Sequence, residues 1–162
     1  MRIALLLLML VSLCACSTAS IPQKCEPVTE FTCTVQCTQG ENAYTFALTS
    51  HTDSTFLLEI TEPQIMAGVS FVRDAQGLYT VDANGIKDIF TAETFTDQSP
   101  VKLLFTALDT LLFTGAKTAE KTQNGNRNVT VSINNQPFNA VFSPDGYLLQ
   151  FSVADMKYIF QY

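Results

Sequence analysis

The amino-acid sequence predicts a mostly β protein of the α+β class, with about eleven antiparallel strands and one main helix. The chain of 162 residues contains 12 Phe and 5 Tyr but no Trp, and only 15% of it is charged. Aromatic and β-branched residues favour pleated sheet. After residue 30, apolar and polar side chains alternate through most of the chain, the period of half-buried strands. Only the stretch after residue 99 changes to helical spacing.

The first residues have the pattern of an export signal. Arg2 precedes an apolar run at 3–13 that contains one serine. A permanent span across the ~30 Å hydrocarbon core of a bilayer takes about 20 residues, so this run is too short for one. Its length suits the hydrophobic region of a secretory signal. We therefore expect residues 1–15 to be a signal peptide.

The run ends in Leu13-Cys14-Ala15-Cys16, which resembles a bacterial lipobox. That resemblance implies that Cys16 carries a diacylglyceryl group and becomes the first mature residue. Residues 16–27 are then a lipidated tether, and the protein is anchored to the extracytoplasmic face of the cell membrane. The alternative is a freely secreted protein, cleaved after Ala15 or Ala19.

The first half of the domain reads as a meander of short strands. Alternating apolar residues, separated by polar turns, predict strands at 31–38, 44–48, 56–60, 69–73, 78–82 and 86–90. Asn84-Gly85 is a strong hairpin signal. Pro63 and Gly68 mark an interruption at 62–68, because proline cannot donate to a central ladder.

One convincing helix follows, over residues 101–113. Ser99 is a suitable N-cap, Pro100 suits the first turn, and Gly115 is a suitable end. The helix is apolar except for a narrow polar stripe. We expect that stripe, Lys102, Thr106 and Asp109, to face water. We expect the opposite side to point into the sheet through Leu104, Leu108 and Leu111.

The rest of the chain returns to sheet. Strands are expected at 117–123, 127–133, 138–142, 147–153 and 157–162. Asn124-Gly125 and Asn134-Asn135 are hairpin signals, and residues 143–146 read Ser-Pro-Asp-Gly, a β-turn sequence.

Three cysteines follow the lipobox: Cys25, Cys33 and Cys37. The last two lie on one face of a strand, about 13 Å apart at roughly 3.3 Å per residue. A disulfide needs Cα atoms within about 7 Å, so these two cannot bridge each other. A candidate disulfide would join Cys25 to Cys33 or Cys37. The alternative is that Cys33 and Cys37 are buried free thiols.

Charge and composition argue against several classes of function. Without Arg2, eight basic residues face 15 acidic ones, a net charge of about −7. An acidic chain without a basic stripe is a poor nucleic-acid binder. The single histidine, His51, lies in a polar turn beside Ser50 and Asp53, and no nucleophile elbow is present. We expect no enzyme, no metal site and no cofactor.

The layout resembles the lipoprotein-carrier (LolA/LolB-like) superfamily, in its Gram-positive lipoprotein form. The resemblance covers about 28–162 and depends on Pro63, Met66 and Gly68, on the Ser99-Pro100 helix start, and on Asp145-Gly146. It implies a curved antiparallel half-barrel with the helix on its concave face. Members of the family hold acyl chains between sheet and helix. By that resemblance, the candidate cavity-lining residues are Leu104, Phe105, Leu108, Leu111 and Leu112.

Two functions follow from these features. The first is a membrane-anchored exported lipoprotein whose half-barrel binds an apolar ligand, a lipid or an acylated protein. The alternative is a non-catalytic module of the cell envelope with a solid core, which docks a partner protein.

Overall fold

The computed structural model describes residues 26–114, 119–133 and 136–162. The predictions for the signal peptide, Cys16, Cys25, Gly115 and the Asn134-Asn135 turn lie outside these ranges.

In the part of the chain that the structure describes, eleven strands form one antiparallel sheet that does not close, so the predicted fold class is confirmed. They are β1 (Phe31–Gln39), β2 (Asn42–Ser50), β3 (Phe56–Glu62), β4 (Ser70–Arg73), β5 (Tyr79–Ala83), β6 (Ile86–Phe90), β7 (Ala119–Gln123), β8 (Asn126–Ile133), β9 (Gln136–Phe142), β10 (Leu148–Val153) and β11 (Met156–Gln161). Two short 3₁₀ turns, η1 (Gln64–Met66) and η2 (Ala92–Thr94), interrupt the first half.

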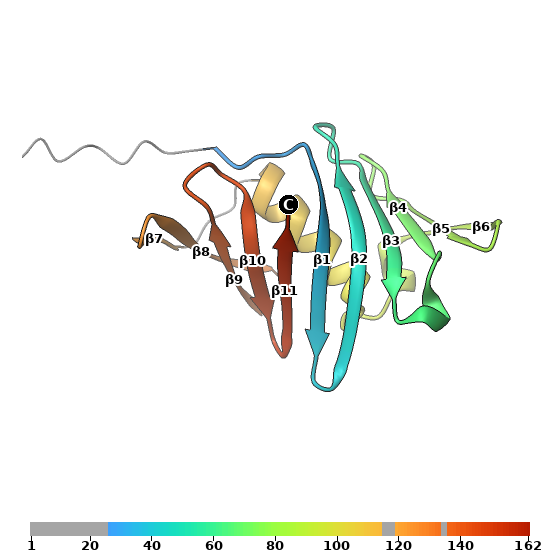
Figure 1. Cartoon of the computed structure of the whole chain (residues 1–162). Coiled ribbons are helices and arrows are strands. Elements are labelled where there is room, and N and C mark those ends of the chain that lie inside the picture. Colours follow the sequence, from blue (N-terminus) through green and yellow to red (C-terminus); the bar gives the residue numbers. More distant parts are fainter. Residues whose placement is uncertain (1–25, 115–118, 134–135) are drawn as a thin grey trace, which may run out of the picture.

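The strand order is β6-β5-β4-β3-β2-β1-β11-β10-β9-β8-β7. The first and last strands therefore pair in the middle of the sheet, where Val35 lies opposite Phe160. Strands β6 and β7 are its two edges. The connection between these edges has to cross the sheet, and it contains the helix, which lies against one side of the curved sheet (Figure 1).

Period-two alternation decides which side of the sheet is buried. In β1, the inward side chains Phe31, Cys33, Val35 and Cys37 are buried, while the threonines and glutamine between them are exposed. Strand β11 shows the same alternation. The inward side chains and the helix form one continuous hydrophobic core. The opposite face is exposed and mostly uncharged, as expected for a sheet with one face in water.

Two hairpins have the backbone that their sequences predict. Asn84 and Gly85 have φ of 56° and 83°, and Asn124 and Gly125 have φ of 52° and 82°. Positive φ at both central residues is the type I′ pattern, which matches the twist of the flanking strands. The turn at 143–146 is also confirmed, because the Gly146 N–H donates to the Ser143 carbonyl at 3.1 Å.

The helix begins as predicted and continues in a different form. Ser99 Oγ accepts a hydrogen bond from the Lys102 N–H at 3.5 Å, and Pro100 is the first residue of α2 (Pro100–Leu108). From Asp109 the chain winds as a π-helix, η3 (Asp109–Thr114), where the sequence predicted one uniform helix. Thr106, Thr110 and Thr114 each donate from the hydroxyl to the carbonyl four residues earlier. Such bonds compete with the helical ladder and often bend or weaken a helix.

Candidate functional site: the concave face of the sheet

The five predicted cavity-lining residues meet on the concave face, where α2 and η3 pack against the sheet. Leu104, Phe105 and Leu108 are 0% exposed, and Leu111 and Leu112 are 1% and 7% exposed. The polar stripe of Lys102, Thr106 and Asp109 is only partly exposed. The five residues thus belong to a packed core in this state, and the helix occupies the space in front of the sheet.

An aromatic cluster fixes the helix over strands β3 to β5. The Phe105 ring stacks on Phe56 at 5.7 Å between centroids and lies 5.7 Å from Tyr79. Phe113 meets the edge of Phe56 at 5.9 Å, and Phe95, from the connection before the helix, lies 5.0 Å from Tyr79. Aromatic pairs at these separations contribute about 0.5–1.5 kcal/mol beyond their buried area. Of these aromatic residues, only Phe105 was predicted from the sequence to line the concave face.

Two polar contacts tie the helix to the sheet itself. The Tyr158 hydroxyl, from β11, donates to the Pro100 carbonyl at 2.9 Å. At the other end, Arg73 Nη2 lies 3.4 Å from Asp109 Oδ2. Burial raises the pKa of Tyr158, so its hydroxyl remains a donor at physiological pH. We call the Arg73–Asp109 pair the latch.

Besides Asp109, two other groups position the Arg73 side chain. Its Nη1 donates to the Ser54 carbonyl at 3.3 Å, and its guanidinium lies 5.7 Å from the centre of the Phe56 ring. Because the side chain is mostly buried, its charge depends on these neighbours. Arg73 was not predicted as a site residue, although a basic residue on the inward face of a strand is unusual enough to indicate a charged partner.

A second ion pair fixes the segment before the helix. Lys102 Nζ lies 2.8 Å from Asp97 Oδ1 and donates to the Phe95 carbonyl at 3.2 Å. The bond from Lys102 lowers the pKa of Asp97. Asp97 is 93% exposed, so this pair is a surface interaction that solvent screens, and it contributes little to stability.

Cys33 and Cys37 lie on the buried face of β1, as the alternation predicted, and neither forms a disulfide with another described residue. Burial raises the pKa of Cys33 to about 12. Burial likewise raises the pKa of Cys37 to about 11, partly offset by a hydrogen bond with Tyr158. The predicted disulfide involves Cys25, outside the described residues, and stays a prediction.

These thiols should resist alkylation in the folded protein. Reaction needs the thiolate, and at pH 8 a thiol with a pKa near 11 is about one part in a thousand ionised. We expect iodoacetamide to modify Cys33 and Cys37 only after unfolding, by peptide mass mapping. An Ile65→Cys variant is the control, because position 65 is 93% exposed and should react at once. Equal rates at all three positions would contradict the burial of β1.

The polar residues around His51 form and stabilise a turn. His51 is exposed, and its backbone N–H donates to the Thr55 carbonyl at 3.0 Å. The Ser50 hydroxyl donates to the Thr29 carbonyl at 2.6 Å, and the Asp53 carboxylate accepts from the Thr55 N–H. Within the described ranges, no three His, Cys, Asp or Glu side chains gather as a metal site would require.

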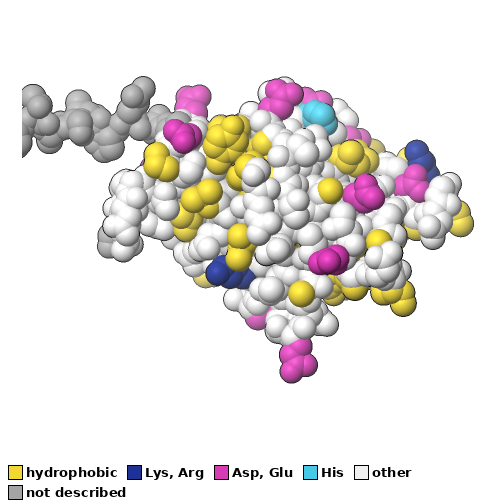
Figure 2. Space-filling model, in the orientation of Figure 1, with side chains coloured by type: hydrophobic (Ala, Val, Ile, Leu, Met, Phe, Trp, Pro, Cys, Tyr) yellow, Lys and Arg dark blue, Asp and Glu magenta, His cyan; other side chains and the backbone are white. Residues whose placement is uncertain are grey.

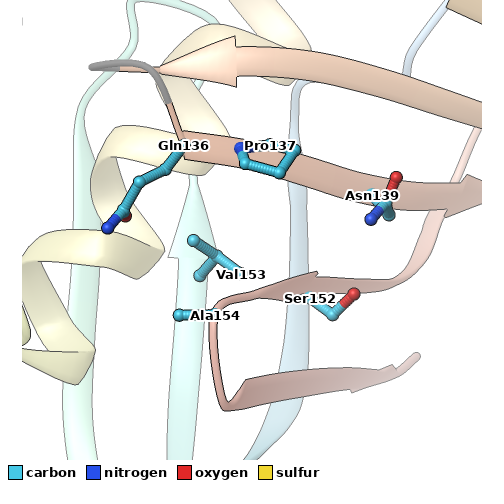
Figure 3. Close-up of a pocket in the computed structure, with 6 residues that line it drawn as sticks. All are labelled: Gln136, Pro137, Asn139, Ser152, Val153 and Ala154. Atoms are coloured by element: carbon cyan, nitrogen blue, oxygen red, sulfur yellow. The ribbon is translucent and has the colours of Figure 1, made fainter.

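A separate hollow lies beyond the concave face, where β9 begins and β10 ends (Figure 3). Its volume is about 350 Å³, and it is open to solvent. It is lined by Gln136, Pro137, Asn139, Ser152, Val153 and Ala154. None of the five candidate cavity-lining residues lines it, and its walls contain no charged side chain.

None of the helices in the part of the chain that the structure describes is long and apolar enough to cross a bilayer.

The fold and the concave face define an open antiparallel half-barrel whose interior is filled by a helix. No family model and no curated protein matches the sequence. Solved structures similar in fold include the following two. A LolA superfamily protein, NE2245 from Nitrosomonas europaea, has a TM-score of 0.43 at 10% identity over 83% of this chain and 85% of that one. PNGF-II has a TM-score of 0.39 at 9% identity over 80% of this chain, which spans only 26% of that protein.

Proposed function

We propose that this protein is a membrane-anchored exported lipoprotein whose half-barrel takes up an apolar ligand when the helix moves off the concave face. The ligand is the acyl chain of a lipid or of an acylated protein, and the anchor is Cys16 on the extracytoplasmic side of the cell membrane. The observation that supports uptake is the helix itself. An apolar helix fills the concave face with leucine and phenylalanine side chains, the surface that an acyl chain would contact.

The helix has features of a removable element. Its second half is π-helical, a form that occurs often at functional sites. Three threonines bond back to its carbonyls and weaken its ladder. Among the described residues, polar contacts to the sheet include one hydroxyl bond, at Pro100, and the latch, at Asp109.

Weakening the latch tests this proposal. Asp109→Asn keeps the size of the side chain and removes its charge, so the closed arrangement should lose about 0.5–1.5 kcal/mol. Uptake of a fluorescent fatty acyl probe should then rise about two- to tenfold, because each 1.4 kcal/mol is a factor of ten. Hydrogen exchange through 103–112 should become faster in parallel.

The matched control for the latch is Asp97→Asn. It removes the charge of Asp97 from the Lys102–Asp97 ion pair. Asp97 is 93% exposed, and this pair does not connect the helix to the sheet. Probe uptake by this variant should equal that of the parent protein. If neither the parent nor Asp109→Asn binds the probe, carriage of an apolar ligand is contradicted.

The second candidate is a non-catalytic envelope module that docks a partner protein through its surface. It is favoured by the complete burial of Leu104, Phe105 and Leu108, which is what a permanently solid core requires. Under this proposal the helix never leaves the sheet. Slow exchange through 103–112 together with no probe binding would support it.

A further inference from the structure

The beginning of the described chain is tied to one end of the sheet beside two exposed tyrosines. The Val28 N–H donates to the Gly146 carbonyl at 3.0 Å, in the turn between β9 and β10. The next residue, Tyr147, is 38% exposed, and its ring meets that of Tyr162 edge-on at 4.7 Å. Tyr162 is 50% exposed and packs on Phe31 at 5.4 Å. We call Phe31, Tyr147 and Tyr162 the N-terminal rim.

A hydrogen bond fixes the orientation of one tyrosine ring in the N-terminal rim. The Tyr162 hydroxyl donates to the Leu148 carbonyl at 2.9 Å, which fixes the ring beside Tyr147. In Figure 2, hydrophobic side chains gather at the corner of the molecule where the described chain begins. The two tyrosines thus expose apolar ring faces at the point from which the tether leaves.

The length of the tether decides which part of the protein can reach the membrane. Residues 16–25 separate the proposed anchor at Cys16 from the described chain. Ten residues span at most about 36 Å when fully extended. Strand β1 extends roughly another 30 Å to the opposite end of the sheet. The N-terminal rim is therefore the surface that the anchor holds nearest to the bilayer.

We propose that the N-terminal rim docks on the bilayer surface, with Tyr147 and Tyr162 in the headgroup layer. This inference depends on the proposed anchor at Cys16. Tyrosine is enriched at membrane interfaces because its side chain is amphipathic. The apolar ring contacts lipid while the hydroxyl group contacts water. A docked rim orients the sheet upright on the membrane, so the concave face opens sideways along its surface.

Charge determines which bilayer suits this surface. Glu26, Glu30 and Asp145 lie within five residues of Phe31 or Tyr147 in the chain and are exposed. Figure 2 shows acidic side chains beside the same corner. Carboxylates are repelled by anionic headgroups, whose surface potential acts within about a Debye length. The rim should therefore favour zwitterionic lipid and withdraw as anionic lipid is added.

The absence of tryptophan in the sequence makes docking measurable. Tyr147→Trp introduces a single reporter at an exposed position. The full-length lipidated variant is reconstituted into phosphatidylcholine vesicles with and without brominated phosphatidylcholine as a quencher. We expect quencher lipid to remove about half of the emission, as for a ring at the depth of the headgroups. Replacing part of the phosphatidylcholine by phosphatidylglycerol should reduce that quenching.

The control reporter is Ile65→Trp, in η1 at the opposite end of the sheet (Figure 1). Ile65 is 93% exposed, more than Tyr147 at 38%, so the reporter at position 65 is fully open to solvent but should not be quenched by the lipid. Thermal unfolding of both variants is compared with that of the parent, so a folding defect is recognised. Tyr162→Ser in the Tyr147→Trp background should reduce quenching, since it removes the second ring of the rim.

The outcomes separate docking from anchoring. Protein that floats with vesicles while Trp emission at position 147 is unquenched overturns docking and leaves the anchor intact. Protein that does not float overturns both. Equal quenching at positions 65 and 147 also overturns docking, because the protein then has no preferred orientation. If position 147 is shielded from a soluble quencher only in whole envelopes, a protein partner covers the rim, and docking on lipid is wrong.

Discussion

Leu108→Ala should lower the free energy of unfolding by about 2–5 kcal/mol, the usual cost of truncating a buried leucine. Leu108 is 0% exposed and lies on the side of α2 that faces the sheet. The substitution removes apolar contacts and leaves a space that close-packed neighbours refill only in part. A typical domain is stable by only 5–15 kcal/mol, so the loss is a large share of the total.

The same substitution distinguishes the two proposed functions. Leu108 makes these contacts only while the helix is seated, so truncation should also favour the displaced helix and raise uptake of the acyl probe. Chemical denaturation gives the stability, and probe fluorescence gives the uptake. A large loss of stability with slow exchange through 103–112 and no probe binding would contradict carriage and leave the interaction module.

Leu57→Ala is the matched control for Leu108→Ala. Leu57 is on the outer face of β3 and is 41% exposed, so truncation there should cost about 1 kcal/mol or less. It should not change probe uptake, because the side chain has no contact with the concave face. Similar losses for the two variants would mean that α2 is not part of the core.

Cys16→Ala should abolish attachment to the membrane. Diacylation requires the thiol, and each buried CH₂ of an acyl chain contributes about 0.8 kcal/mol to membrane binding, so losing two chains releases the protein or leaves it unprocessed. Fractionation and mass spectrometry of the mature N-terminus measure the effect. Cys14→Ala is the control and should stay anchored. An unmodified mature N-terminus at Cys16 or Ser20 would show that the lipobox prediction is wrong.

The sequence predicted local features of the fold well, because each depends on neighbours in the chain. The strand at 86–90 was predicted at the bounds that β6 has, and the Asn84-Gly85 turn adopts the expected backbone. The cap at Ser99 and the burial of Leu104 and Leu108 also agree with the structure. Short-range periodicity and capping chemistry are sufficient for such predictions.

The partners of the candidate site could not be predicted in the same way. The latch joins Arg73 to Asp109, and the aromatic cluster joins Phe56 and Tyr79 to Phe105. Each pair is more than twenty residues apart in the chain, so no local pattern connects its members. The π-helical end of the helix was also not predicted, because the sequence pattern of this segment, threonines included, does not distinguish an α-helix from a π-helix.

What the sequence determined alone is which side chains alternate, where the chain turns, and that one apolar helix interrupts the sheet. Hydrophobic periodicity and turn chemistry act over a few residues and need no further information. Only the tertiary structure decided that β1 pairs with β11, which brings the two ends of the domain to the centre of the sheet. That pairing separates edges β6 and β7 and sends the helix across the concave face. The physical reason is that most of the helix surface is apolar and must be buried. The strands that bury it are far apart in the chain, and only the folded sheet brings them together.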